Sequence, residues 1–308
     1  MEAELAIVNG LNVFPVPDGD TGANMLATMA EALSRAAGAR TLAESAEQLA
    51  LGAMLGARGN SGVILSQLFR ALSETLRAES SISSRAIIDV FARASDLAFA
   101  TVAEPIEGTM LTVLRAMSEA GAGARGKPAS DVLRNAVLAA EEAVARTPEQ
   151  LPLLHDAQVV DSGGYGLLLI VRGWYEALSQ RPAPEMHHHL LGVDRVRAQI
   201  ALGEIHPASP LEHRSDRYGY CVTLLVDGAT VQEVDVRRQL SELGESALVV
   251  AAEGRLKLHV HVADPDVALG YAGQIGTITR SDVSNIDEQA GALAPAATLP
   301  VVAVVPGQ

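Results

Sequence analysis

Apolar residues recur at helical spacing throughout the first 180 residues of the chain. The segment from Ser61 shows the pattern well, because its apolar positions form one stripe of a 3.6-residue period: Ile64, Leu65, Leu68, Phe69 and Leu72. Comparable segments predict helices over 23–36, 42–55, 61–78, 85–103, 109–122, 130–146 and 163–179. Gly and Pro clusters separate these segments, and no convincing strand pattern occurs before residue 200. We therefore expect an all-α domain over residues 1–182.

The pattern changes after residue 182. Residues 183–210 are polar and rich in Pro, which is typical of a linker. Beyond them, strand patterns over 220–226, 247–252, 256–263 and 276–286 combine with helical patterns over 230–243 and 265–274. The order β-α-β-β-α-β predicts a small ferredoxin-like domain over residues 211–292. The fold class is therefore multidomain, α followed by α+β. Residues 293–308 read as the start of a third domain that is cut short.

Composition and charge narrow the functional classes. Aromatic residues make up only 3% of the 308 residues, which fits a helical core of Ala and Leu. The net charge of −14 argues against a nucleic-acid partner, because phosphate backbones bind basic surfaces. The single cysteine excludes an internal disulfide and favours a reducing compartment. Because neither a membrane-spanning apolar run nor a signal-peptide pattern occurs, we expect a cytoplasmic protein that is not integral to a membrane.

Two carboxylates stand one residue apart in a Gly-rich loop. Asp18 and Asp20 follow a Pro-containing entry and precede the first predicted helix. Two carboxylates on a tight turn offer the hard oxygen ligands that Mg²⁺ prefers, with phosphates filling other positions. A helix N-cap is an equally good interpretation of these residues alone. A calcium EF-hand loop is excluded, since Met29 stands where that loop requires Glu.

A second glycine-rich segment, residues 56–62, stands immediately before the helix predicted from Ser61. Small residues, a hydroxyl group and free helix N–H groups together suit an anion. The segment is not a P-loop, because Gly-Lys-Ser/Thr occurs nowhere in the chain. Lysine is also absent from the first 126 residues, so phosphate charge must be met by a metal, by Arg or by backbone N–H groups. Taken alone, a turn between helices with Ser61 as N-cap remains the simpler interpretation.

Four motifs in order resemble the DhaL-type kinase domain, and more specifically the ATP-binding subunit of bacterial fatty acid kinase. They cover residues 9–25, 56–67, 107–111 and 161–164. The resemblance implies an antiparallel helical barrel that binds ATP and Mg²⁺ at one end. It implies that Asn12, Asp18 and Asp20 hold Mg²⁺, with Asp18 and Asp20 as the catalytic pair. The other implied nucleotide-binding residues are Thr21, Asn24, Asn60, Ser61, Gly62, Thr109, Met110, Leu111, Asp161 and Gly163. For Thr109–Leu111, a cap followed by core residues is the alternative.

The second domain carries a candidate metal site. His259 and His261 alternate on one predicted strand, so both imidazoles face the same side, and Cys221 lies on another strand of that sheet. One thiolate and two imidazoles suit Zn²⁺, although a lone buried Cys is more often a small apolar residue. Residues 218–221, 258–265 and 284–289 resemble the middle domain of the ATP-binding chain of fatty acid kinase. In that family the Cys and His positions are associated with zinc, in a structural or a functional role.

The resemblance implies a function for the whole protein. We expect ATP-dependent phosphorylation of a fatty-acid carboxylate that a separate binding protein presents, which yields an acyl phosphate. The family also implies a homodimer. Two alternatives stay open: a kinase for a small polyol such as dihydroxyacetone, and a scaffold that binds the nucleotide without turnover.

Overall fold

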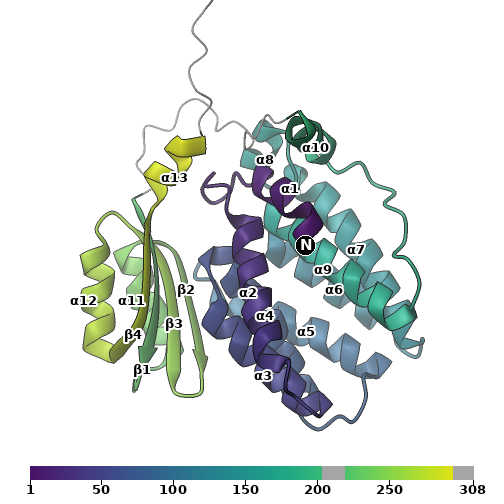
Figure 1. Ribbon diagram of the computed structural model, residues 1–308, viewed down its shortest axis with the longest axis horizontal. Coiled ribbons are helices and arrows are strands. Elements are labelled where there is room, and N and C mark those ends of the chain that lie inside the picture. The colour runs from purple at the N-terminus through teal and green to yellow at the C-terminus, as the bar shows by residue number, and fades with distance from the viewer. Residues whose placement is uncertain (203–218, 294–308) are drawn as a thin grey trace, which may run out of the picture.

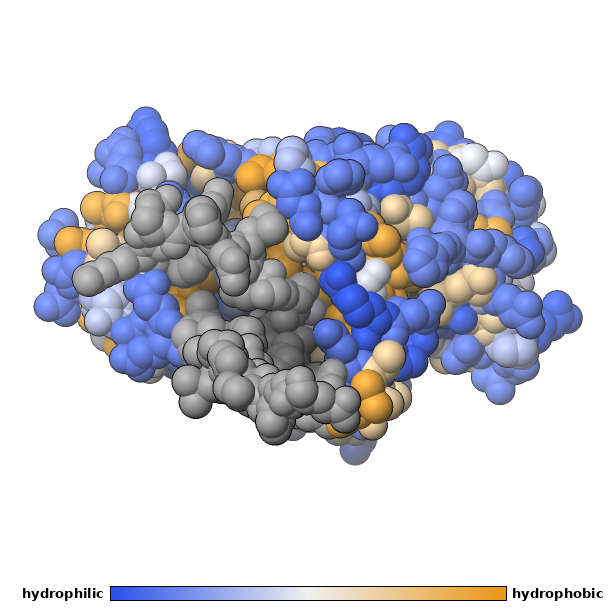
Figure 2. All heavy atoms as spheres, turned by 90° about the horizontal axis from the view of Figure 1, so that it is seen from above, coloured by the Kyte–Doolittle hydropathy of each residue, from blue (hydrophilic) through white to orange (hydrophobic). Residues whose placement is uncertain are grey.

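The computed structural model describes residues 1–202 and 219–293. The expected third domain, 293–308, therefore falls almost entirely outside the described residues. The first domain is helical, as expected, and the second combines helices with a sheet (Figure 1). Within the described residues no helix is both long enough and apolar enough to cross a membrane. In the view of Figure 2, most residues along the outline of the molecule are hydrophilic.

The predicted helices of the first domain are all present. They are α2 (Thr21–Ala36), α3 (Leu42–Gly56), α4 (Gly59–Leu76), α5 (Ser84–Thr101), α6 (Met110–Ala122), α7 (Ala129–Gln150) and α9 (Ser162–Ser179). Local signals set several of their starts. Thr41 accepts a hydrogen bond from the Glu44 N–H at the start of α3, and Ser83 accepts one from the Ala86 N–H at the start of α5. The sequence pattern did not predict three short elements: the 3₁₀ turn Glu2–Glu4, α1 (Leu5–Gly10) and α8 (Pro152–Ala157).

These helices close into a ring around one core. Each helix from α2 to α7 contacts the next, α7 contacts α9, and α9 returns to α2 and α1. The buried apolar stripes meet inside; Leu65 and Leu68 of α4, for example, are each 1% exposed. These contacts confirm the expected helical barrel. The N-termini of α2, α4, α6 and α9 lie at one end, because their first residues line connected cavities there.

The stretch expected as a linker, 183–210, is only partly a connector. Residues Val193–Ala201 form α10, which contacts α1. Val193 and Val196 are buried in the core of the first domain, and a Cβ on Gly10 would lie 2.5 Å from Val196 Cγ1. The sequence pattern did not predict this short helix, because it lies in a segment rich in Pro and polar residues and has only two buried residues. The helical domain therefore extends to residue 201.

The second domain has the expected βαββαβ order. Its elements are β1 (Tyr220–Asp227), α11 (Glu233–Leu243), β2 (Glu245–Ala252), β3 (Arg255–Val262), α12 (Pro265–Ile275), β4 (Thr277–Asn285) and α13 (Ile286–Leu293). The four strands pair antiparallel in the order β2-β3-β1-β4, which is the strand order of the ferredoxin-like unit. Alternate residues such as Val222, Leu224 and Val226 face α11 and α12, and the residues between them face the helical domain.

The sheet packs directly against the helical domain (Figure 1). An apolar cluster crosses the boundary, formed by Met54, Ala57 and Val63 on one side and by Leu225, Leu248 and Val250 on the other. Lys257 is 4% exposed, and its Nζ donates to the Leu55 carbonyl oxygen over 3.3 Å. Burial lowers the pKa of Lys257 to about 8. This contact places one face of the sheet over the end of the barrel where α4 begins.

Candidate metal and nucleotide site

The loop between α1 and α2 presents the two acids. Its entry contains a cis peptide bond between Phe14 and Pro15. Asn12, 2% exposed, ties the loop together: its Nδ2 donates to the Val16 carbonyl oxygen over 2.7 Å, and its Oδ1 accepts from the Thr21 N–H over 3.1 Å and from the Thr21 hydroxyl. We expected Asn12 to be a metal ligand. Its oxygen already accepts two hydrogen bonds, so Asn12 holds the loop, and it also lines the small cavity beside Asp18 and Asp20. Its role as a Mg²⁺ ligand stays a prediction.

Asp18 and Asp20 lie together in a largely buried position. Burial, followed by the charge of Asp20, raises the pKa of Asp18 to about 8. Burial also raises the pKa of Asp20, against the opposing effect of a hydrogen bond with Asn24. Two adjacent half-buried carboxylates resist carrying two charges, and a divalent cation removes that penalty. The pair therefore fits Mg²⁺ in its donor type and in its electrostatics.

The glycine-rich segment brings the start of α4 against α2. Gly59 has φ +56°, and a Cβ there would lie 2.5 Å from Asn24 Nδ2. A Cβ on Gly62 would lie 2.5 Å from the Thr28 hydroxyl oxygen. The buried Oδ1 of Asn60 has no hydrogen-bond partner within the described chain. The close approach places the free N–H groups and positive dipole end of α4 beside Asp18 and Asp20, where a phosphate chain would lie.

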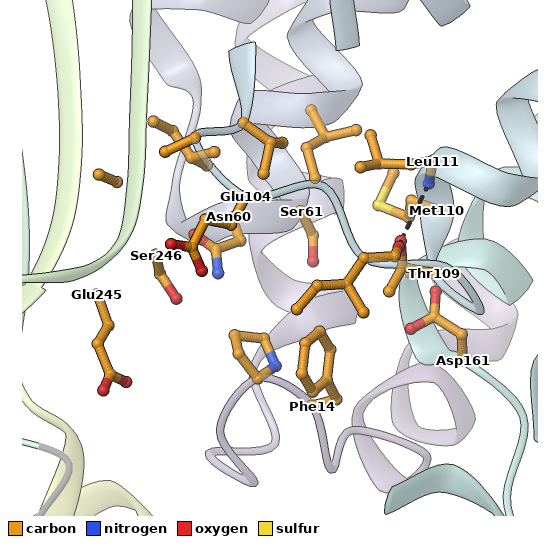
Figure 3. A pocket seen from close by; sticks show the side chains of 18 of the residues that line it. Phe14, Asn60, Ser61, Glu104, Thr109, Met110, Leu111, Asp161, Glu245 and Ser246 are labelled. Atoms are coloured by element: carbon orange, nitrogen blue, oxygen red, sulfur yellow. Dashed lines mark hydrogen bonds between the residues drawn. The ribbon is translucent and has the colours of Figure 1, made fainter. Parts of the chain in front are cut away.

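The starts of α6 and α9 form another wall. Thr109 caps α6, with its hydroxyl accepting from the Leu111 N–H over 3.4 Å, and Asp161 caps α9 by accepting from the Gly164 N–H over 2.7 Å. A Cβ on Gly163 would lie 2.5 Å from Met110 Cγ. Both interpretations of this segment therefore have structural support: Thr109 is a cap and Met110 and Leu111 are buried, yet all three also line a cavity of about 500 Å³ (Figure 3).

Ser162 links the wall formed by α6 and α9 to the acidic loop. Its hydroxyl donates to the Thr21 hydroxyl oxygen over 3.1 Å, which joins the start of α9 to the start of α2. Burial raises the pKa of Asp161 to about 7, against the lowering effect of backbone hydrogen bonds from Gly164 and Met110. The starts of α2, α4, α6 and α9 thus converge, and their combined dipoles favour an anionic ligand between them.

The structure brings together Cys221, His259 and His261, the metal ligands expected in the second domain. Their ligand atoms all lie within 4.8 Å of one another, and Cys221 Sγ lies 3.8 Å from His259 Nδ1. His259 Nδ1 also lies 3.0 Å from the Thr223 hydroxyl oxygen, and the buried Nε2 has no partner among the described residues. A fourth position would be open to another ligand. The donor set of one thiol and two imidazoles fits Zn²⁺.

The electrostatics of this group also fit a cation. Burial lowers the pKa of His261 to about 4 and that of His259 well below its usual value, so both imidazoles are neutral and can donate a lone pair. Burial, then the charges of Asp20 and Asp18, raises the pKa of the Cys221 thiol to about 12. A bound metal ion would reverse that effect, since it stabilises the thiolate directly.

The two predicted metal sites, which the sequence placed in different domains, share one cavity. Asp18, Asp20 and Asn24 line it from the helical domain, and Cys221 and His261 line it from the sheet. The cavity is small, about 30 Å³, which is room for an ion or a water molecule rather than a substrate. It adjoins the larger cavity, because Phe14, Pro15, Asn60 and Ser61 line both.

Sequence patterns missed several residues of this region. Asn9 accepts hydrogen bonds from the Gly22 N–H over 2.8 Å and the Ala23 N–H over 3.1 Å, so it caps α2 from a separate helix. Glu104, Glu245 and Ser246 line the larger cavity. The spacing of residues along the chain does not indicate these positions, because each residue meets the site across the boundary between two elements or two domains. Of the expected nucleotide-binding residues, Gly62 is buried against Thr28 and lines neither cavity.

Comparisons with known proteins agree with this geometry. The DAK2 domain family matches residues 15–176, and the family of FakA-like middle domains, from fatty acid kinase, matches residues 217–293. An uncharacterized protein of Staphylococcus saprophyticus is 33% identical over 293 residues, covering 92% of this chain and 52% of that protein. An uncharacterized protein of Staphylococcus aureus strain USA300 is 32% identical over 291 residues, with the same coverage.

The chain thus spans about half the length of the curated relatives it matches. Its two matched segments coincide with the helical barrel and with the βαββαβ domain. Both belong to kinase families, and the converging helix starts and acidic loop lie inside the first segment. The chain belongs to the DAK2-domain family and carries the FakA-like middle domain of fatty acid kinases.

Proposed function

We propose that the protein is an ATP-dependent kinase subunit that phosphorylates the carboxylate of a fatty acid presented by a separate carrier protein. The observation that carries the proposal is the shared cavity, where Asp18 and Asp20 face Cys221 and His261 across the domain boundary. A phosphate-binding end and a second metal-binding group at the same point suit transfer between two anionic partners. The matched middle domain favours an acyl acceptor over a polyol.

The residues divide the work between binding and charge neutralisation. Asp18 and Asp20 would hold Mg²⁺, which supplies positive charge to the triphosphate. Asn60, Ser61 and the free N–H groups of α4 would hold phosphate oxygens, and Thr21 and Asn24 support the same corner. A carboxylate acceptor is already a nucleophile at neutral pH, so the site needs no strong general base. Positioning and electrostatics would provide most of the rate enhancement.

Cys221, His259 and His261 would hold Zn²⁺, which would supply a Lewis-acidic centre beside the phosphate end. The three side chains come from the middle domain, which this chain carries in addition to the helical barrel. We therefore assign them to the acceptor side of the reaction. We also propose that the protein acts in the cytoplasm, as its cysteine content and apolar patterns suggest, and that it forms a homodimer, as the family resemblance implies.

The test supplies the protein with Mg²⁺ and ATP, and with one of three acceptors: none, dihydroxyacetone, or a fatty acid loaded on its carrier. ADP and hydroxylamine-trapped acyl phosphate are measured together. Formation of acyl hydroxamate in step with ADP only in the third mixture supports the proposal. Turnover with dihydroxyacetone alone would assign the chain to polyol kinases. Binding of ATP without turnover in any mixture would make it a nucleotide-binding scaffold, and both of these results contradict the proposal.

A further inference from the structure

The larger cavity has walls from two domains. Residues of the helical domain line one side, including Glu104, Ile106 and the Thr109–Leu111 turn. The other side is lined by Ser241 of α11 and by the segment Gly244–Leu248, which consists of the residue after α11 and the start of β2. Figure 3 shows the side chains of Glu245 and Ser246 on the side of the cavity that carries the sheet, with Asn60 and Glu104 between them and Thr109. A ligand in this cavity would touch both domains.

Backbone pairing fixes this second wall to the first. Val102, which directly follows α5, forms an antiparallel bridge with Leu248, and the Ala103 N–H donates to the Ala247 carbonyl oxygen over 3.4 Å. The edge strand β2 therefore pairs with the start of the connection between α5 and α6. That connection ends at Thr109, the cap of α6. The sheet thus holds the segment that leads to Thr109, Met110 and Leu111, three of the expected nucleotide-binding residues.

The start of β2 is irregular where it meets the cavity. The register of β2 against β3 shifts between Glu245 and Leu248, and Ser246 has φ +55°. A left-handed conformation costs a residue other than Gly about 1 kcal/mol, and bulges of this kind often redirect side chains beside functional sites. Gly244 lies against β3 so closely that a Cβ would be 2.1 Å from the His261 carbonyl oxygen. The bulge therefore connects the cavity wall to the strand that carries His261.

The chemistry of the cavity suits the nucleoside end of a nucleotide. The carboxylates of Glu104 and Glu245, which line the cavity, can accept hydrogen bonds from a ligand. Ribose hydroxyl groups and an exocyclic amino group offer the matching donors. The volume of about 500 Å³ lies within the range of roughly 300–1,000 Å³ typical of small-molecule pockets.

We propose that the bulged segment Gly244–Leu248 of the middle domain is the second wall of the nucleoside subsite, with Ser246 in contact with the nucleoside and Glu245 accepting hydrogen bonds from it. This inference rests on the proposed ATP-dependent function. It makes nucleotide binding depend on the docking of the middle domain against the barrel. Asp18 and Asp20 line the smaller cavity, which Ser246 does not line, so phosphate binding there does not require Ser246.

The test compares two Trp substitutions at left-handed positions of the same hairpin. Ser246→Trp fills the cavity, whereas Glu253→Trp lies at the exposed β2–β3 turn, where φ is +51°. Calorimetry measures the binding of Mg²⁺–ATP and of Mg²⁺–tripolyphosphate, which lacks a nucleoside, to the whole chain. We expect Ser246→Trp to weaken ATP binding by about 10-fold or more and to leave tripolyphosphate binding unchanged. Glu253→Trp should bind both as the wild type does.

A substitution on the opposite wall, Ile106→Trp, should reproduce the ATP-specific loss and serves if Ser246→Trp does not fold. ATP binding at wild-type affinity in folded Ser246→Trp would overturn the inference while leaving the proposed function intact. An equal loss of both probes would also overturn it, because the substitution would then act at the phosphate end. A wild-type protein that binds tripolyphosphate and ATP equally would exclude a nucleoside subsite, and one that binds neither would overturn the proposed function itself.

Discussion

Cys221 lies directly opposite His261 in the antiparallel register of β1 and β3, and both side chains line the cavity that also holds Asp18 and Asp20. Paired residues of neighbouring strands project to the same face, so the register alone brings thiol and imidazole together. The sheet then packs that face onto the barrel. The thiol and the imidazole, which the second domain brings together by itself, thereby line a cavity that both domains share.

The first prediction concerns the acidic pair. We expect Mg²⁺ to raise the melting temperature of the wild type, and replacing Asp18 with Asn removes one carboxylate and should abolish that rise. Without Mg²⁺ and above about pH 8, where Asp18 of the wild type ionises, the variant should melt at the same temperature or higher, because the neutral amide does not repel Asp20. Thermal unfolding with and without Mg²⁺ measures both effects. Asp89→Asn, an exposed position that pairs with Arg85 on α5, is the matched control and should respond as the wild type does.

The second prediction concerns zinc. The wild-type protein should hold about one Zn²⁺ per chain, because three ligands and an open position suffice for a zinc site. Cys221→Ser and His261→Ala should each lose most of it, as should His259→Ala. Elemental analysis of the purified proteins gives the ratio. His189→Ala, in the exposed tract 187–189, is the control. Equal zinc content in the control and in Cys221→Ser would remove Cys221 from the ligand set.

The third prediction concerns the pH dependence of stability through Asp161. Its pKa is raised from 3.8 to about 7 in the folded state by burial. Between these values the folded protein binds the proton and the unfolded chain does not, so this group loses stabilising effect as the pH rises from about 4 to 7. Asp161→Asn keeps the acceptor for the Gly164 N–H and cannot ionise. Relative to the wild type, the variant should therefore gain stability across this window, on the order of 1–3 kcal/mol.

Chemical unfolding of both proteins at pH 5 and pH 8 checks the sign. Asp161 also accepts the N-cap hydrogen bond, so Asp161→Ala should be destabilised at both pH values by about 1 kcal/mol or more. The free energies of unfolding of Asp161→Asn and of the wild type could instead change by the same amount between pH 5 and pH 8. That result would show that Asp161 does not titrate in this range.

The fourth prediction concerns Gly59. An added Cβ would meet Asn24 Nδ2 at 2.5 Å, and the backbone has φ +56°. Gly59→Ala should therefore destabilise the protein by about 1–3 kcal/mol and weaken ATP binding, because the start of α4 must move away from α2. Gly38→Ala is the control, since a Cβ there meets no atom within 4 Å. Denaturant unfolding and nucleotide titration of both variants separate the effects; equal behaviour would contradict the close approach.

The sequence predicted most of the fold because the relevant signals are local. Apolar periodicity placed the long helices to within a few residues, and alternation placed the strands. Helix α10 escaped because only Val193 and Val196 mark its buried face, inside a segment rich in Pro and polar residues. Single-residue chemistry likewise indicated Asp18 and Cys221 but not their proximity. That proximity depends on domain packing through Lys257 and the apolar cluster around Leu248, which no local pattern encodes.

The role of Asn12 shows the same limit at smaller scale. Its amide is a plausible metal ligand in a sequence, since Asn oxygens do bind hard cations. In the folded loop the amide joins Val16 to Thr21, and its oxygen accepts twice from Thr21. Residue type alone therefore did not predict that Asn12 holds the loop, because this role depends on the folded positions of Val16 and Thr21.

The measurement that tests the central claim most directly is acyl phosphate formation by the wild type, Asp18→Asn and His261→Ala, with Mg²⁺–ATP and a carrier-bound fatty acid. Each variant must first show wild-type helical content by circular dichroism. We predict that the wild type forms acyl hydroxamate in step with ADP. Both variants should be slower by about 100-fold or more, since each removes one side of the shared cavity. Acyl phosphate formation at the wild-type rate in either folded variant would contradict a single site built from both domains.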